Sequence, residues 1–308
     1  MSSPCDIERQ NAHRALTVTD AINRYAQSAP GGNRKKLNHS EAVTVATSRS
    51  VRAWSDLKSI VSASYVWRAL AWADIRSKYR LSTLGTLWIT LSTGVTAVSI
   101  GLIYGQFFGQ NLSTYLPYFT AGMIFWTFIA SVIGESTQAL ISSGSWIKGA
   151  NLPIVFYVMR MLQRNFLILL HNFIIVALVW LYYRWDLQAG ALMCIVGLGL
   201  TYAFLLGLSL MIAIACVRYR DVPPMVAALI QFIFLASPII WHSSQVKVGS
   251  ALVWLNPITH LLAVTRDPLI GLPIDLQSFG IATGMAGLSL TAGALIYERY
   301  RDRIAYWV

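Results

Sequence analysis

Long apolar runs alternate with short polar segments from residue 81 to the carboxyl end of the chain. A membrane-spanning helix needs about 20 consecutive, mostly apolar residues. The pattern therefore predicts an all-α integral membrane protein with six transmembrane helices. We expect these helices at 85–108, 117–140, 162–183, 189–216, 224–241 and 278–297.

The segment 54–80, before the first apolar run, is amphipathic but too charged to span a membrane. Trp67, Ala71 and Ile75 lie on one stripe at helical spacing, and Arg76 lies to one side of it. Indole rings are stable in the headgroup layer, so the pattern favours an interface helix that lies along the membrane surface. The alternative is a soluble helix that packs on a partner.

A polar segment with glycine and proline separates the second and third apolar runs. It is longer than most helix–helix connections. Ser145 is a candidate helix cap, and Trp146 and Ile147 form an apolar edge. Lys148 adds a charge, and Pro153 restarts the chain. We expect a short surface helix here that contacts a separate protein.

The connection between the fifth and sixth runs, 242–277, is long. It carries Trp254, Asn256 and Pro257, and its apolar stretches are too short for a span. One or two short re-entrant or interfacial helices fit this composition. Such helices would cap the outer mouth of whatever the spans enclose.

Charge supports this layout. Only 12% of the 308 residues are charged, about half of what soluble proteins carry, and the mean hydropathy is +0.54. With the amino terminus inside, the inner segments hold 21 of the 24 Lys and Arg residues and the outer segments hold 3. This positive-inside pattern predicts two cytoplasmic termini. It also explains the net charge of +11 as a topology signal, so we expect no nucleic-acid partner.

The polar amino-terminal region contains no apolar core typical of a cleaved signal peptide. We expect a mostly disordered cytoplasmic extension. The predicted organisation is a tail, an interface helix, a six-span permease domain and a cytoplasmic carboxyl-terminal tail, at 1–53, 54–80, 81–298 and 299–308.

Motifs for catalysis are missing from the sequence. It contains no GxxxxGK[ST] nucleotide loop, no HExxH and no cysteine pair with metal or redox spacing. We therefore expect no catalytic residues, no metal and no cofactor bound by this chain. Glu135 and His171 are the ionisable residues expected within the spans. An intramembrane carboxylate is a functional candidate, but pairing with an arginine is the favoured interpretation for Glu135 and hydrogen-bonded packing for His171.

Aromatic residues are abundant in the first hairpin and the fifth span. They form either lipid-facing belts and core, or a pore lined by ring faces. A ring face can contact the C–H side of a sugar without binding it strongly, which suits conduction of a sugar chain. The candidate pore residues are Tyr104, Phe107, Phe108, Phe125, Phe232 and Phe234.

Glycines recur at four-residue spacing in two places. Gly101, Gly105 and Gly109 form overlapping GxxxG patterns, and Gly280 with Gly284 forms another. Such patterns allow two helices to approach closely, within one chain or between two copies.

Several stretches together resemble one family. Asp74 to Trp88 reads DIRSKYRLSTLGTLW and resembles the motif before the first span of polysaccharide-export ABC transporter permeases. Four further stretches are similar to motifs of that family in the same order: NLP at 151–153, RYRDV at 218–222, SPII at 237–240 and LNPITH at 255–260. The ordered set runs from about residue 54 to the carboxyl end.

The resemblance implies the channel-forming subunit of an ATP-driven exporter that moves a lipid-linked, O-antigen-like polysaccharide across the cytoplasmic inner membrane. It implies a homodimer, surrounded by membrane lipids, with two ABC ATP-binding subunits that bind ATP and magnesium. This chain would then not be an enzyme. The alternatives are an ABC permease for teichoic acid, capsule, a drug or a lipid, or an ion-coupled carrier.

The resemblance also assigns roles to particular residues. The coupling helix, seated in a groove of the ATPase, would contain Ser145, Trp146, Ile147, Lys148, Asn151 and Pro153. The interface helix would present Trp67, Asp74, Arg76, Tyr79 and Arg80. The outer gate would contain Trp254, Asn256 and Pro257. An inner loop would present Arg218, Arg220 and Asp221.

Overall fold

A computed structural model describes residues 64–78, 85, 87–149, 152–186, 189–241 and 250–308. All regular structure in these ranges is helical. The elements in chain order are α3 (Ser64–Lys78), α4 (Leu87–Phe107), α5 (Leu112–Ser136), α6 (Gly144–Gly149), α7 (Ile154–Tyr183), the 3-10 helix η2 (Ala189–Leu192), α8 (Met193–Arg218), α9 (Val222–Ala236), α10 (Ser250–Leu255), α11 (Pro257–Leu269) and α12 (Leu276–Trp307).

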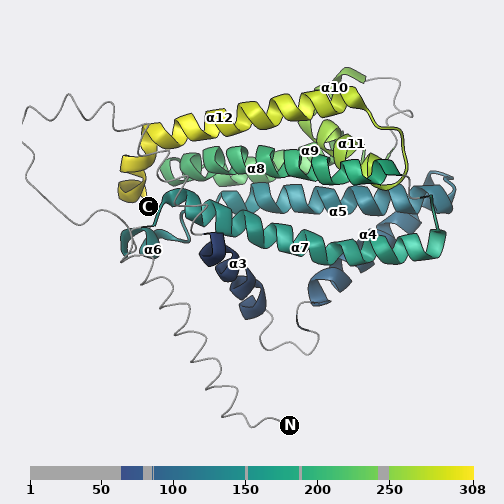
Figure 1. The fold of residues 1–308 in the computed structure, drawn as a ribbon, viewed down its shortest axis with the longest axis horizontal. Helices are drawn as coiled ribbons and strands as arrows, with labels where there is room; N and C mark the ends of the chain where they lie inside the picture. Colours follow the sequence, from purple (N-terminus) through teal and green to yellow (C-terminus); the bar gives the residue numbers. More distant parts are fainter. Residues whose placement is uncertain (1–63, 79–84, 86, 150–151, 187–188, 242–249) are drawn as a thin grey trace, which may run out of the picture.

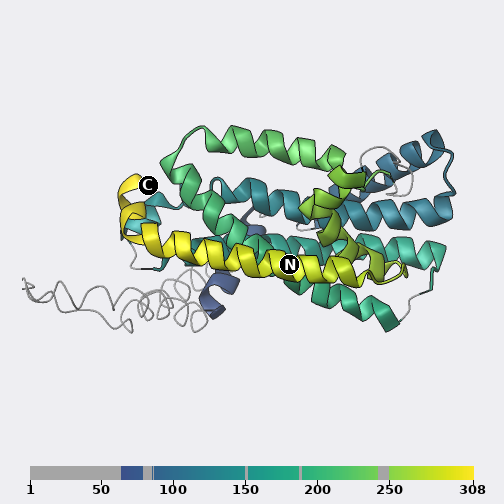
Figure 2. The ribbon, with the colours of Figure 1, turned by 90° about the horizontal axis from the view of Figure 1, so that it is seen from above.

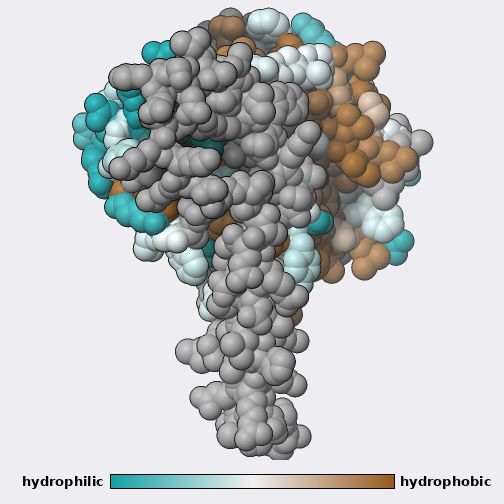
Figure 3. Space-filling view, turned by 60° about the vertical axis from the view of Figure 1, so that its left-hand side comes forward, coloured by the Kyte–Doolittle hydropathy of each residue, from teal (hydrophilic) through white to brown (hydrophobic). Residues whose placement is uncertain are grey.

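Five stretches of the described chain are long and apolar enough to cross a membrane: α4, α5, α7, Gly190–Arg218 and most of α12. They run along the long axis of the molecule (Figure 1). α3, α6 and the carboxyl terminus lie at one end, here called the α6 end, and α10 and α11 lie toward the other, here called the α11 end. Figure 3 shows a broad apolar area on one flank of the molecule. The chain is a multi-pass integral membrane protein.

The fifth predicted span is shorter in the structure. α9 has 15 residues, which corresponds to about 22 Å of helix against about 30 Å of hydrocarbon. It begins at Val222, with proline in its first turn, and ends at Ala236 because Pro238 cannot continue a helix. α9 lies along one side of the bundle (Figure 2), and Val226 is its one buried residue.

The predicted start of the third span is also corrected. α7 begins at Ile154 rather than near residue 162. The prediction counted Arg160 and Arg164 on the inner side and began the span between them. Both lie within the helix, where carboxylates of neighbouring helices pair with them. At the carboxyl end, α12 continues without a break to Trp307, so the predicted tail 299–308 is the last part of this helix.

Close helix packing uses Gly207, which the sequence did not single out, and two of the predicted glycines. A Cβ at Gly207 of α8 would overlap the backbone of Ser289 in α12, so the two helices touch at this point. Gly101 and Gly105 do take part in packing, against α5 of the same chain. Gly280 and Gly284 have open space around their Cα atoms.

Candidate functional site

The polar segment after α5 forms the short helix α6, as the sequence predicts. Trp146 is 55% exposed, and Ser145 and Lys148 are exposed beside it. Ile147 packs against the core and holds the helix to the bundle. Pro153 occupies the N-cap position of α7. Asn151 lies outside the described residues.

The carboxyl terminus supports α6, which the sequence did not indicate. A Cβ at Gly144 would lie 2.7 Å from Val308 Cγ1, so the last residue of the chain packs directly on the start of α6. Trp307, next to it, lies 5.4 Å below the guanidinium of Arg218 at the end of α8. Arg220 and Asp221, predicted for the same inner loop, are exposed between α8 and α9.

An ion-pair network connects α3, α5 and α7 near α6. Arg160 Nε lies 2.8 Å from Asp74 Oδ2, and Arg164 Nη2 lies 2.6 Å from Glu135 Oε2. Arg164 Nη1 is 3.5 Å from Asp74, so this one side chain links both carboxylates. The Asn165 amide also donates to Glu135. The predicted arginine partner of Glu135 is confirmed.

Beside this network is a polar cavity of about 430 Å³, lined by residues from α3, α5, α6 and α7. Trp146 forms one part of the cavity wall, and Arg160 and Arg164 form another part. The Tyr157 hydroxyl is buried there and has no hydrogen-bond partner among the described residues. The cavity therefore adjoins both the exposed helix α6 and the charged network.

α3 packs through the predicted stripe. Trp67, Ala71 and Ile75 are buried, with Ala71 and Ile75 almost fully covered. Asp74 faces the arginines of α7, whereas Arg76 is exposed. The remaining predicted interface residues, Tyr79 and Arg80, lie outside the described residues.

His171 of α7 is a packing residue, as predicted. Its Nδ1 lies 2.8 Å from the Leu167 carbonyl oxygen, and its ring stacks on Trp72 of α3 with centroids 6.1 Å apart.

The aromatic residues proposed for a pore fall into two groups. Tyr104, Phe107 and Phe108 are exposed near the end of α4, and Phe232 is exposed on α9. Phe125 is corrected: it is 1% exposed and packs edge-to-face on Phe173, so it belongs to the core of the chain. Phe234 is partly covered because its ring packs on Trp126.

The segment between α9 and α12 contains two short helices, in agreement with the sequence. Asn256 caps α11 by accepting a hydrogen bond from Ile258 N at 3.0 Å, and Pro257 occupies the first turn. The Asn256 amide also donates to Ser237 Oγ at 2.9 Å, which ties α11 to the end of α9. Trp254 is exposed in α10.

Two features of the α11 end carried no clear sequence signal. The Arg266 side chain is buried, with its guanidinium 3.8 Å from the ring centroid of Tyr118 and Nη1 donating to the Pro238 carbonyl at 2.7 Å. His260 lies 3.0 Å from Ser278 Oγ, which donates to Asp275. The hydrogen bond from Ser278 lowers the pKa of Asp275, at the start of α12. The position of Arg266 within an apolar stretch of the sequence was the only indication of these contacts.

Comparison with known proteins identifies the architecture. Residues 65–270 match the model of the ABC-2 type transporter family. The chain is also 22% identical over 247 residues to the O-antigen export system permease protein RfbA of Myxococcus xanthus, covering 77% of this chain and 93% of that protein. The chain belongs to the ABC-2 type transporter family and is a membrane permease subunit.

Proposed function

We propose that this chain is the channel-forming subunit of an ATP-driven exporter of a lipid-linked polysaccharide. The observation that carries the proposal is how α6 is held. Trp146 and Lys148 are exposed, while Ile147 and Val308 pack the helix against the rest of the chain. A rigid helix with an exposed aromatic and a charge is suited to receive force from a partner.

The partner would supply the energy. The sequence has no nucleotide-binding loop, and the described residues contain no group of His, Cys, Asp and Glu suited to a metal ion. ATP and magnesium would be bound by two separate ATP-binding subunits. Their closure would push α6, and the pairs of Arg160 and Arg164 would pass this movement to α3, α5 and α7.

Homodimer formation would create the pore. α4 and α9 both carry long exposed apolar faces, and Figure 2 shows the two helices on the same side of the bundle. Their exposed rings, Phe107 on α4 and Phe232 on α9 among them, would line the path of the sugar chain. α11, fixed by Arg266 and Asn256, would form the outer gate.

The α6 end would face the cytoplasm of a cell inner membrane, because most basic residues flank that end. The cargo assignment is supported by the similarity to an O-antigen export permease and by the exposed rings. Teichoic acid, capsule, a drug or a lipid are the alternative cargoes. An ion-coupled carrier is disfavoured because Glu135 is paired with Arg164.

The α6 assignment is tested with Trp146→Ala and Lys148→Glu in cells that also express the ATP-binding subunit. An aromatic anchor at an interface contributes about 2 kcal/mol or more, so Trp146→Ala should weaken co-purification of that subunit roughly 30-fold. Surface polymer should fall in parallel, while the amount of chain in the membrane stays constant.

Leu192→Ala is the control, since Leu192 is also apolar and exposed, at 69% against 55% for Trp146, but lies in η2, after the far end of α7. Unchanged co-purification with Trp146→Ala and Lys148→Glu would refute the role of α6. Reduced co-purification together with loss of a different surface polymer would refute the cargo assignment alone.

A further inference from the structure

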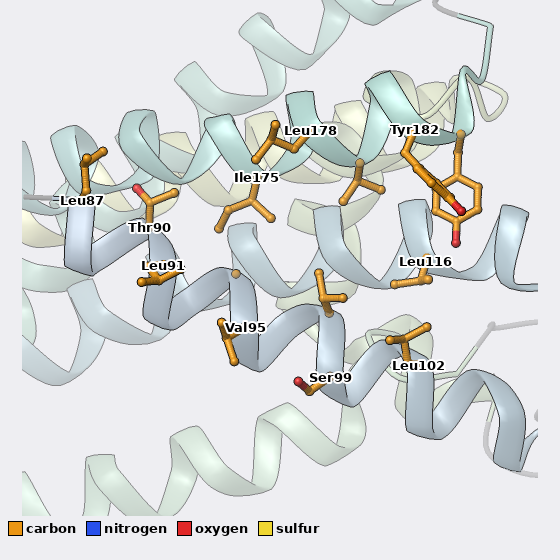
Figure 4. A pocket seen from close by; sticks show the side chains of 14 residues that line it. Leu87, Thr90, Leu91, Val95, Ser99, Leu102, Leu116, Ile175, Leu178 and Tyr182 are labelled. Carbon is orange, nitrogen blue, oxygen red and sulfur yellow. The ribbon is translucent and has the colours of Figure 1, made fainter. Parts of the chain in front are cut away.

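An apolar groove of about 870 Å³ lies between α4 and α7, and none of the described residues that line it belongs to α9. Its side chains point into the space between the two helices (Figure 4). Leu91 and Val95 contribute from α4 and Leu178 from α7, and all three are exposed. Because both helices are spans, this groove opens toward hydrocarbon rather than water.

The length of the groove suits a lipid acyl chain. It is lined from Leu87 to Leu102 along α4, about 22 Å at 1.5 Å per residue. One leaflet contributes about half of the roughly 30 Å hydrocarbon core of a bilayer. The groove is therefore long enough to hold an acyl chain of one leaflet.

One end of the groove adjoins α3. Thr90, part of the lining, donates from Oγ1 to the backbone oxygen of His171 at 3.2 Å, and the ring of His171 stacks on Trp72. Tryptophan is enriched at the level of the lipid headgroups. Trp72 therefore marks the depth at which hydrocarbon gives way to headgroups at this end of the groove.

The exposed face of α3 is basic at this position. Arg68, Trp72 and Arg76 are each four residues apart, so they lie on one face of the helix, and all three are exposed. The nearby carboxylate of Asp74 is engaged by Arg160 and Arg164 of α7, on the side that packs against the bundle. Arg68 uses Nε and Nη2 to donate to Ser64, and its guanidinium lies over the Trp67 ring. The donor groups offered to a headgroup on this face are therefore Nη1 of Arg68 and the guanidinium of Arg76.

We propose that the groove and the Arg68–Trp72–Arg76 face form one binding site for an anionic phospholipid of the bilayer. An acyl chain lies between α4 and α7, and the phosphate contacts the two arginines. Guanidinium groups bind phosphate oxygens through charge-assisted, often bidentate hydrogen bonds. Basic residues close to a membrane surface also attract anionic headgroups. The site is independent of the proposed export function.

The test uses the full-length chain in nanodiscs of phosphatidylcholine and phosphatidylglycerol in equal amounts, with bound lipid counted by native mass spectrometry. The wild-type chain should retain one phosphatidylglycerol in preference to phosphatidylcholine. Val95→Trp, which fills the groove, should abolish this retention. Arg68→Gln with Arg76→Gln should reduce the preference roughly tenfold, because two charge-assisted contacts are lost.

Matched controls carry the same chemical changes elsewhere on the molecule. Leu288→Trp places an indole on an exposed position of α12, and Arg299→Gln with Arg303→Gln removes two exposed charges from the same helix. Both controls should bind lipid as the wild-type chain does. Leu178→Trp fills the groove from α7 and replaces Val95→Trp if that variant does not fold.

Four results would overturn the proposal. One is that a folded groove-filling variant retains as much phosphatidylglycerol as the wild-type chain does. Another is an unchanged lipid preference after loss of Arg68 and Arg76. The third is a groove-filling variant that alters the dimer fraction but not the lipid count, since a second copy would then cover the groove. Displacement of the bound phospholipid by purified lipid-linked polysaccharide would assign the site to cargo and overturn it as well.

Discussion

The pair of Arg164 and Glu135 provides the sharpest test of how movement at α6 reaches the spans. We consider Glu135→Gln, Arg164→Gln and the double variant. Glu135→Gln keeps the size of the side chain and an acceptor for the Asn165 amide, so it removes charge and little else. Arg164→Gln removes the side chain that joins two carboxylates, those of Asp74 and Glu135.

The expected free energies follow from the distance between the two charges and from the exposure of their side chains. Two unit charges about 4 Å apart near a protein surface attract by about 4 kcal/mol. The Arg164 and Glu135 side chains are 30% and 40% exposed, so solvent screening and the cost of desolvation reduce this value substantially. We expect a coupling free energy of about 1–2 kcal/mol for the pair. Arg164→Gln alone should cost about 2–3 kcal/mol, because it leaves Glu135 without its cation, whereas Asp74 keeps Arg160.

The assay is a double-mutant cycle with two measurements on the same four proteins. Thermal unfolding in detergent gives the stability coupling, at a few °C per kcal/mol. Export driven by the ATP-binding subunit gives the functional coupling. The control cycle uses Arg301 and Asp302, which lie 3.9 Å apart with Asp302 80% exposed, and its coupling should be close to zero.

Export should fall more in either single variant than its stability loss explains, because each variant disconnects α5 from α7 at the α6 end. Additive effects of the two substitutions on stability, together with normal export, would show that the pair is a surface contact without a transmitting role. That result would refute the reasoning, since this ion pair is the charged contact proposed to join α5 to α7 at the α6 end.

Further predictions concern packing and fixation of the ends. Gly207→Val should destabilise the protein by about 3 kcal/mol or more and lower the unfolding temperature, because its side chain would overlap α12. Gly199→Val on the same helix should be nearly neutral, since open space surrounds that position. Arg266→Gln should loosen α11 by removing the bond to Pro238, seen as faster proteolysis at the α11 end with α3 unaffected. Trp307→Ala should reduce export while leaving insertion intact, because it weakens the support below α6; unchanged export would exclude that support.

Hydropathy alone predicted most of the bundle, and its errors have physical causes. The prediction counted Arg160 and Arg164 on the inner side and began the third span at 162, whereas α7 begins eight residues earlier, at Ile154. The partners of the two arginines are a carboxylate on α3 and one on α5, and no local pattern reveals such distant pairs. The start and end of α9 depend on prolines, which the sequence shows, but the apolar run was allowed to continue past Pro238.

Some features of the candidate site follow from the local sequence, and others depend on contacts between distant segments. The exposure of Trp146 and the cap at Asn256 follow from local sequence, so both could be predicted. Phe125 could not be separated from the exposed rings, because an aromatic residue in a span has the same sequence signature whether it faces a pore or Phe173. The contact of Val308 with α6 joins segments more than 150 residues apart and depends on the full length of α12.

The position of the network suggests why it contains charges rather than apolar contacts. An apolar contact between α5 and α7 would be non-directional, so the helices could slide past one another with little change in energy. Arg164 instead has two carboxylate partners on different helices, a hydrogen-bonded one on α5 and an ion pair at 3.5 Å on α3, and a shift of either helix weakens one of these contacts. Charges are costly deep in hydrocarbon but tolerable near its edge, where water screens them. A charged network at the α6 end can therefore respond to small helix shifts at a low desolvation cost. The same residues at mid-span would destabilise the bundle.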